Sequence, residues 1–161
     1  MNIKIICVGK LKEKYLKDAQ LEYLKRLSKY AKVDVCELQD EKFKENPSLS
    51  EIKQTRQKEG EKILREIDKL SKPYIISLDL RGKQYTSEEL AEEFKNITTY
   101  SSSTICFIIG GSLGIDDEVI KRSNKLISFS KLTFPHQLIR IFLLEQIFRV
   151  FKINGNEKYH H

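Results

Sequence analysis

Residues 104–111 (TICFIIGG) restrict the fold more than any other stretch of this sequence, because five consecutive apolar residues precede two glycines. β-branched and aromatic residues of this kind favour strands. A strand that is apolar throughout, with no alternating polar residues, is typical of a sheet covered on both faces. Such sheets are parallel, and their strands are joined by helical crossovers. The stretch therefore predicts an α/β protein with a mainly parallel sheet.

The rest of the chain alternates between strand-like and helix-like patterns. Strands are expected at residues 3–8, 33–38, 74–80, 104–111 and 126–130. Helices are expected at residues 15–27, 87–100, 115–123 and from 135 onward, together with a charged, mostly solvent-facing helix that Ser50 opens. Thr86 and Glu89 have the spacing of a capping box for helix 87–100. This order indicates an open α/β sheet with helices on both faces, in a single domain over residues 1–161.

Composition points to a folded protein of the cytoplasm. Apolar residues form 40% and charged residues 32% of the chain, which is a globular balance. No apolar run approaches the roughly 20 residues of a membrane span, and the N-terminus lacks the apolar region of a signal peptide. The three cysteines are widely spaced and form no C-x-x-C pair: Cys7, Cys36 and Cys106. They are most simply small core residues.

The net charge of +6 is compatible with a polyanionic partner. Acidic and basic residues are interleaved through most of the chain, and the densest basic group comprises Lys10, Lys12, Lys14 and Lys17. This group is either a solvated face or a phosphate contact. Charge alone does not decide between the two.

Three loops are expected to meet past the carboxyl ends of the strands, where ligands bind in such sheets. They are LDLRGK (78–83), GGSLG (110–114) and SFSKLTFPH (128–136). The glycines match neither G-x-G-x-x-G nor a Walker A loop, and no acid follows the next strand to hold ribose hydroxyls. An ordinary dinucleotide site is therefore disfavoured. The glycines alone are equally consistent with a tight turn between strand and helix.

The sequence offers little nucleophilic or metal chemistry. The three histidines are His136, His160 and His161, and none has metal-ligand spacing to another candidate ligand. His136 alone is either a helix-start residue or a catalyst. No nucleophile elbow is present. An enzyme with these residues would depend on positioning and on a cofactor that brings its own reactivity.

The last expected helix is apolar over roughly 200° of its circumference, about twice what one core requires. One apolar stripe comprises Ile139, Leu143, Ile147 and Val150. The adjoining stripe comprises Leu144, Phe148 and Phe151. Such a helix needs two partners, and a second copy of the chain across a two-fold axis is the economical second partner. Arg140 lies within the apolar arc, so it should be paired or reach an anion. Glu145 and Arg149 can pair at i, i+4 on the polar side.

Five motifs, in order along the whole chain, resemble those of the ribosomal RNA large-subunit methyltransferase H family. They are VGKLKEKY, LDLRGK, FIIGGSLG, ISFSKLTFPHQLIR and the terminal YH. Members of that family are small SPOUT-class enzymes that methylate ring nitrogen 3 of a pseudouridine. The resemblance implies a C-terminal deep trefoil knot, which is an exception to the rule against knotted chains. It also implies S-adenosylmethionine as the cofactor, a homodimer, and 23S rRNA within the ribosome as the partner, with neither DNA nor a membrane involved.

The resemblance also implies site residues. The implied cofactor contacts are Leu78, Gly110, Phe129, Ser130, Lys131, Leu132, Thr133 and Phe134. The implied catalytic group comprises Glu145, Arg149, Tyr159 and His160, with His136 and Arg140 as further candidates. No metal site is expected. Without the resemblance, residues 159–161 are a short polar tail with no core to join, and His161 is explained as a tag remnant.

Three other functions remain open. A non-catalytic RNA-binding module would keep the basic surface but would not need three converging loops. A flavodoxin-like nucleotide-binding regulator would use the same crevice, although the sequence lacks an evident phosphate-binding loop. A SPOUT ribose methyltransferase is separated only by the short single-domain form of this chain.

Overall fold

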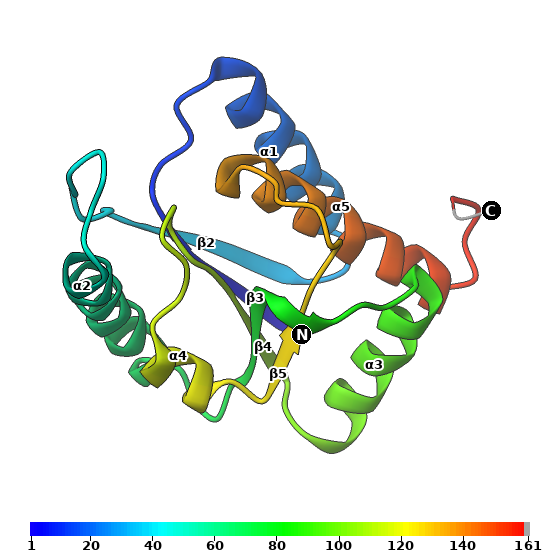
Figure 1. Cartoon of the computed structure of the whole chain (residues 1–161). Coiled ribbons are helices and arrows are strands. Elements are labelled where there is room, and N and C mark those ends of the chain that lie inside the picture. The colour runs from blue at the N-terminus through cyan, green and yellow to red at the C-terminus, as the bar shows by residue number, and fades with distance from the viewer. Residues whose placement is uncertain (160–161) are drawn as a thin grey trace.

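The computed structural model describes residues 1–159, which form one five-stranded sheet in the order β2-β1-β4-β3-β5 (Figure 1). The strands are β1 (Asn2–Val8), β2 (Lys32–Leu38), β3 (Tyr74–Lys83), β4 (Thr104–Ile109) and β5 (Lys125–Ile127). The helices are α1 (Lys14–Leu27), α2 (Leu49–Asp68), α3 (Ser87–Tyr100), α4 (Asp117–Arg122) and α5 (His136–Asn154). Every neighbouring pair of strands is parallel, as the apolar run at residues 104–111 predicts.

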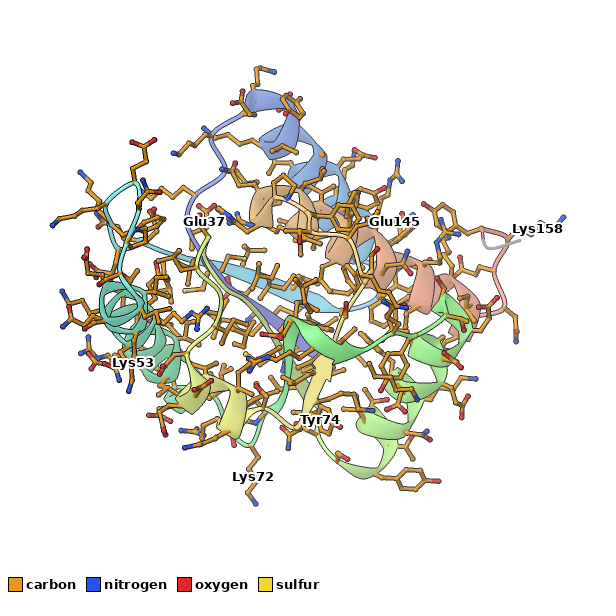
Figure 2. The ribbon with its side chains drawn as sticks, in the orientation of Figure 1. Glu37, Lys53, Lys72, Tyr74, Glu145 and Lys158 are labelled. Carbon is orange, nitrogen blue, oxygen red and sulfur yellow. The ribbon has the colours of Figure 1, made fainter. Side chains whose placement is uncertain are left out.

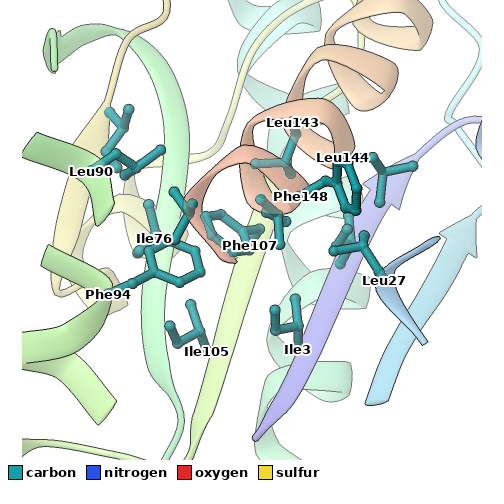
Figure 3. Close-up of a cluster of buried hydrophobic side chains, with 14 of the residues drawn as sticks. Ile3, Leu27, Ile76, Leu90, Phe94, Ile105, Phe107, Leu143, Leu144 and Phe148 are labelled. Atoms are coloured by element: carbon teal, nitrogen blue, oxygen red, sulfur yellow. The ribbon is translucent and has the colours of Figure 1, made fainter. Parts of the chain in front are cut away.

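Helices cover both faces of the sheet, so the expected architecture is confirmed. Helices α1, α3 and α5 lie on one face, and α2 and α4 lie on the other (Figure 1). Alternate residues of β1 enter the two layers: Ile5 and Cys7 face the first, and Ile6 and Val8 face the second. The larger layer is centred on Phe107 of β4, whose ring lies 6.0 Å from that of Phe94 of α3 (Figure 3).

Helix α2 differs from its expected form at its start and on its buried face. It begins two residues earlier than expected, because the Ser48 hydroxyl accepts a hydrogen bond from the Glu51 amide at 3.1 Å and caps the helix. Most of its residues are exposed or half-buried, as expected, but five form a buried face, namely Thr55, Glu59, Gly60, Ile63 and Ile67. This face packs on the sheet and on α4. The many charged residues of α2 gave no sign of this buried face in the sequence.

Strand β5 ends at Ile127, three residues before its expected end, because the end of β3 crosses it closely. A Cβ atom on Gly82 would lie 2.6 Å from backbone atoms of Ile127. The Ser128 amide then donates to the Lys83 carbonyl at 3.0 Å. The chain therefore leaves the sheet at Ser128 and enters the loop that precedes α5.

The wide apolar arc of α5 finds its second partner within the same chain. Helix α5 packs between α1 and α3 above the sheet, and Figure 3 shows Leu143, Leu144 and Phe148 inside this layer. Leu144 and Ile147 have no exposed surface, and Leu143 has only 1% exposed. The arc by itself therefore does not require a second copy of the chain, and the physical reason given for one from the sequence is wrong.

Candidate functional site

The expected loops at residues 110–114 and 128–136 do meet, and together with the end of β3 they enclose a cavity of about 1080 Å³. Residues 78–83, expected as a third loop, are instead the last residues of β3. Its wall includes Leu78–Arg81, Ile109–Ile115 and most of Ile127–His136, with Arg56 from α2 and Ile139 from α5. The cavity lies past the carboxyl ends of β4 and β5 and beside the last residues of β3, close to the position at which open α/β sheets bind ligands. The predicted location of the site agrees with this geometry.

Seven of the eight predicted cofactor contacts line the cavity, and Lys131 does not. The seven are Leu78, Gly110, Phe129, Ser130, Leu132, Thr133 and Phe134. Lys131 is exposed on the same loop. Hydroxyl groups shape this loop: Ser128 Oγ donates to the Ser130 carbonyl at 2.8 Å, and the Leu132 amide donates to Ser130 Oγ at 3.0 Å.

The glycine loop (residues 110–114) is held in a narrow space that larger residues would not fit. A Cβ atom on Gly110 would lie 2.6 Å from Ile115 Cγ1, far inside van der Waals contact. The Gly114 amide closes the turn by donating to the Gly111 carbonyl at 3.1 Å, and Gly114 has φ +94°. Gly110 therefore allows close packing against Ile115, and Gly114 allows the turn itself.

Sequence reasoning missed three polar residues in the cavity wall: Arg56, Asp79 and Arg81. Arg81 donates to both carboxylate oxygens of Asp79, at 2.9 and 3.2 Å, and this guanidinium lowers the pKa of Asp79. Arg56 Nε donates to the Leu113 carbonyl at 2.5 Å. Asp79 and Arg81 lie in the segment 78–83, which the sequence already assigned to the site, so their position was a usable signal. Arg56 lies on the helix interpreted as solvent-facing, and nothing in its spacing marked it.

A smaller hollow of about 310 Å³ adjoins the cavity. The two share Ile127–Ser130 and Phe134, and Glu145, Gln146 and Phe142 of α5 close the hollow on its other side. This arrangement brings Glu145 to the same loop that forms the wall of the main cavity.

Glu145, Arg149 and Tyr159 form one cluster beside this hollow. Glu145 accepts a hydrogen bond from the Tyr159 hydroxyl at 2.8 Å and pairs with Arg149 at 2.7 Å. The Arg149 guanidinium also lies 4.7 Å from the centre of the Tyr159 ring, which contacts Phe148 edge-on at 5.0 Å. Burial and the neighbouring Glu145 carboxylate raise the pKa of Tyr159. The structure thus brings together three of the four residues that the family motifs assign to a catalytic group, and His160 and His161 lie outside the described residues.

The tail does have a core to join, contrary to the expectation from its length and polarity. Tyr159 is half-buried and packs against the larger hydrophobic layer of the protein. Glu157 takes part as well, since it accepts a hydrogen bond from Tyr30 at 2.9 Å and pairs with Lys152 at 2.6 Å. Residues 155–159 are consequently bound along the end of α5.

His136 begins α5 and lines the cavity, half-buried against the backbone of Gly9. Burial, with Arg140 and Lys12 nearby, lowers the pKa of His136. The lowered pKa favours the neutral imidazole, in which one nitrogen is able to accept a proton.

Arg140 is 1% exposed and is not part of the cavity wall. Its Nη1 donates to Glu37 Oε2 at 2.5 Å, and its Nη2 donates to the Gly9 carbonyl at 3.0 Å. Burial alone would raise the pKa of Glu37, but Arg140 and the Leu11 amide outweigh it and lower that pKa. Figure 2 shows Glu37 at the end of α5 away from Lys158. The paired anion expected for Arg140 is thus Glu37, which ties α5 to the edge of the sheet.

The described residues contain no group of three or more His, Cys, Asp or Glu side chains that could hold a metal ion. Within residues 1–159, no helix has the length and hydrophobicity that a membrane crossing requires.

Cys7 and Cys106 are buried, and burial raises the pKa of each thiol to about 12.

The sequence of this chain matches one protein family and is similar to several named proteins over its whole length. Residues 1–160 match the family described as "Predicted SPOUT methyltransferase". A protein of Bacillus cytotoxicus named ribosomal RNA large subunit methyltransferase H is 56% identical over 161 residues, covering 99% of each chain. Proteins with the same name from Bacillus thuringiensis and Lactobacillus delbrueckii subsp. bulgaricus are 55% and 53% identical, again over 99% of each chain.

These matches extend over the parallel sheet, the three segments that form the cavity and α5. They agree with the resemblance that the five sequence motifs carry, and the family in turn implies a knotted C-terminal region. On the evidence of both, this chain belongs to the SPOUT methyltransferases, in the group of ribosomal RNA large subunit methyltransferase H.

Proposed function

We propose that this protein uses S-adenosylmethionine to methylate ring nitrogen 3 of a pseudouridine in 23S rRNA. The substrate is the assembled ribosome in the cytoplasm, and the working form is a homodimer. One observation carries the proposal: seven of the eight residues assigned to the cofactor by family motif line a single cavity. The full-length relatives named ribosomal RNA large subunit methyltransferase H support the choice of substrate class.

The residues present fit this cofactor. The cavity of about 1080 Å³ exceeds the space that one cofactor molecule needs, which leaves room for a target base. Its apolar wall suits the adenine ring, and the backbone groups of residues 128–134 and of the glycine loop suit its polar edges. Asp79 provides a carboxylate in the same wall, but Arg81 pairs with both of its oxygens and Arg56 adds a second positive charge. The fit to the cofactor therefore rests on shape and on backbone groups.

When bound, S-adenosylmethionine supplies a methyl group already activated on a sulfonium centre. The residues of the chain must then align the ring nitrogen and accept its proton. We assign the role of proton acceptor either to Glu145, in its cluster with Arg149 and Tyr159, or to His136. Glu145 lines the smaller hollow and His136 lines the main cavity, and both hollows include residues 127–130. His160 joins this group by family motif. Arg140 is assigned a structural role instead, because its Nη1 and Nη2 donate to Glu37 and Gly9 and its side chain lies outside the cavity wall.

Cofactor binding gives the first test. Calorimetry should show one S-adenosylmethionine bound per chain. Gly110→Val should weaken that binding at least about tenfold, because its Cβ would start 2.6 Å from Ile115 Cγ1 and displace the glycine loop. Gly155→Val, at the far end of α5, is the matched control and should bind normally. Normal binding by Gly110→Val would leave Gly110 as a turn residue only.

The dimer gives the second test. Large apolar side chains are exposed around the two hollows: Leu80 at 60%, Leu132 at 69% and Phe142 at 36%. Covering them with a second chain would remove this surface from water. Sedimentation at low micromolar protein should give twice the chain mass of 18.9 kDa. Phe142→Asp should shift the protein toward the monomer, and a wild-type monomer at that concentration would contradict the proposal.

A further inference from the structure

Glu59 of α2 is a buried carboxylate that the proposed chemistry does not use. It is 4% exposed, and its Oε2 accepts a hydrogen bond from the Glu41 amide at 3.0 Å. Its Oε1 is buried and has no hydrogen-bond partner within residues 1–159. An unsatisfied buried acceptor costs on the order of 1–3 kcal/mol. An acceptor kept in this state therefore needs an explanation.

The unpartnered oxygen lies directly against the glycine loop of the cavity. A Cβ atom on Gly111 would lie 3.1 Å from Glu59 Oε1 and 3.3 Å from Oε2. Gly111 lines the cavity, whereas Glu59 does not. The carboxylate thus contacts the cavity only through the backbone of this loop.

A second residue of the same helix holds the other end of the loop. Arg56 Nε donates to the Leu113 carbonyl, and the Arg56 guanidinium lies 3.5 Å from a Cβ position on Gly114. Residues three apart on a helix project from the same side. Arg56 and Glu59 therefore lie against the two ends of the loop from one face of α2.

We propose that Glu59 is a positioning residue whose Oε1 accepts a backbone N–H of the glycine loop when the cofactor is seated. This inference rests on the proposed function, because it requires a cofactor in the cavity. With the bond made, the loop is fixed to α2 at both ends, by Arg56 at Leu113 and by Glu59 at Gly111 or Ser112. The helix interpreted from sequence as a charged outer element then sets the shape of the cofactor site.

The charges around Glu59 determine how the proposed contact would change its pKa. Burial raises the pKa of Glu59 above its usual value, and the nearby carboxylates of Asp40 and Glu41 act in the same direction. The Glu41 amide and the Lys62 ammonium oppose them, and Lys62 also pairs with Glu41 at 2.9 Å. Arg56 on the same side of α2 adds a fixed positive charge, whereas Val8 of β1 and Gly111 of the glycine loop carry no titratable side chain.

An N–H donated to Oε1 favours the charged carboxylate, so it lowers the pKa of Glu59 in the complex. Cofactor binding therefore releases protons at any pH between the bound-state and free-state pKa values of Glu59. Affinity rises with pH through this window and becomes flat above the free-state pKa.

Glu59→Gln is the informative variant, because it keeps the size of the side chain and removes the charge. We expect S-adenosylhomocysteine, a stable probe of the cofactor site, to bind about ten- to a hundredfold more weakly. We also expect calorimetry in buffers of different ionisation enthalpy to show proton release for the wild type and none for the variant. Glu61→Gln, exposed on the same helix, is the control and should match the wild type. The thermal midpoint of Glu59→Gln should not fall, since the variant removes a buried charge.

Gly111→Ala provides a second route to the same contact while the carboxylate remains. Its methyl group enters between the loop and Glu59, and it should weaken probe binding by a similar factor. The double variant should bind no more weakly than either single variant, because both remove one interaction. Wild-type affinity and proton release in Glu59→Gln would overturn the role of Glu59. Failure of the wild type to bind the probe at all would instead overturn the proposed function.

Discussion

Arg140→Ala should lower the free energy of unfolding by about 3 kcal/mol, among the largest effects expected for a single side chain of this protein. The substitution empties a fully buried volume and leaves the Gly9 carbonyl and the Glu37 carboxylate without their guanidinium donor. About a third of the Glu37 side chain is exposed, so water partly compensates and holds the loss at the lower end of the usual range. Equilibrium unfolding in urea measures the change.

The same pair predicts how the effect depends on pH. The pKa of Glu37 is lowered in the folded protein, so the pair contributes fully above the unfolded-state pKa of a glutamate. That contribution is lost as the pH falls through the lowered pKa of Glu37. The stability difference between wild type and Arg140→Ala should therefore shrink in acid.

Arg140→Met combined with Glu37→Gln is the matched control. An apolar side chain of similar length fills the space, and the glutamine leaves no unpaired charge, so most of the lost stability should return. A small loss of stability in Arg140→Ala together with loss of methyl transfer would contradict the structural assignment. It would return Arg140 to the catalytic candidates.

Deletion of residues 159–161 should remove most methyl transfer, by about a hundredfold or more, while the protein stays folded. Tyr159 fixes the Glu145 carboxylate through a hydrogen bond at 2.8 Å and packs against Phe148, so its loss frees one side of the proposed proton acceptor. The cofactor residues lie on other segments, so affinity for S-adenosylmethionine should change little. Rates with ribosomes, binding of S-adenosylmethionine and sedimentation of the truncated protein measure the three properties.

Tyr159→Phe separates the hydroxyl group from the rest of the tail. It keeps the ring against Phe148 and removes only the bond to Glu145. A loss in this variant as large as in the truncation would assign the effect to that bond. Full activity in the truncated protein would contradict a functional tail, and the proton acceptor would then be sought at His136 and Glu145.

The order and type of the elements could be predicted from sequence because hydrophobic period is a local property. The buried run in β4, the capping box of Thr86 and Glu89, and the start of α5 at His136 follow from neighbouring residues alone. The three segments of the site could be placed together because parallel strands end at one edge of the sheet, although residues 78–83 extend β3 and do not form a loop.

What could not be predicted depends on partners that are distant in the sequence. Gly82 packs on the backbone of Ile127, and Arg140 meets Glu37 across more than a hundred residues. Helix α2 has a sparse apolar pattern, so its buried carboxylate at Glu59 and the reach of Arg56 to Leu113 left no periodic signal. The coverage of α5 by α1 and α3 likewise depended on packing that a helical wheel does not contain.

The most direct test of the function is methylation of ribosomes isolated from a strain that lacks this methyltransferase. The purified protein would be incubated with them and labelled S-adenosylmethionine, and the 23S rRNA would be digested and mapped by mass spectrometry. The proposed function predicts a single added methyl group, placed on ring nitrogen 3 of one pseudouridine. A methyl group on a ribose hydroxyl, or no transfer to rRNA from any ribosomal particle, would contradict it.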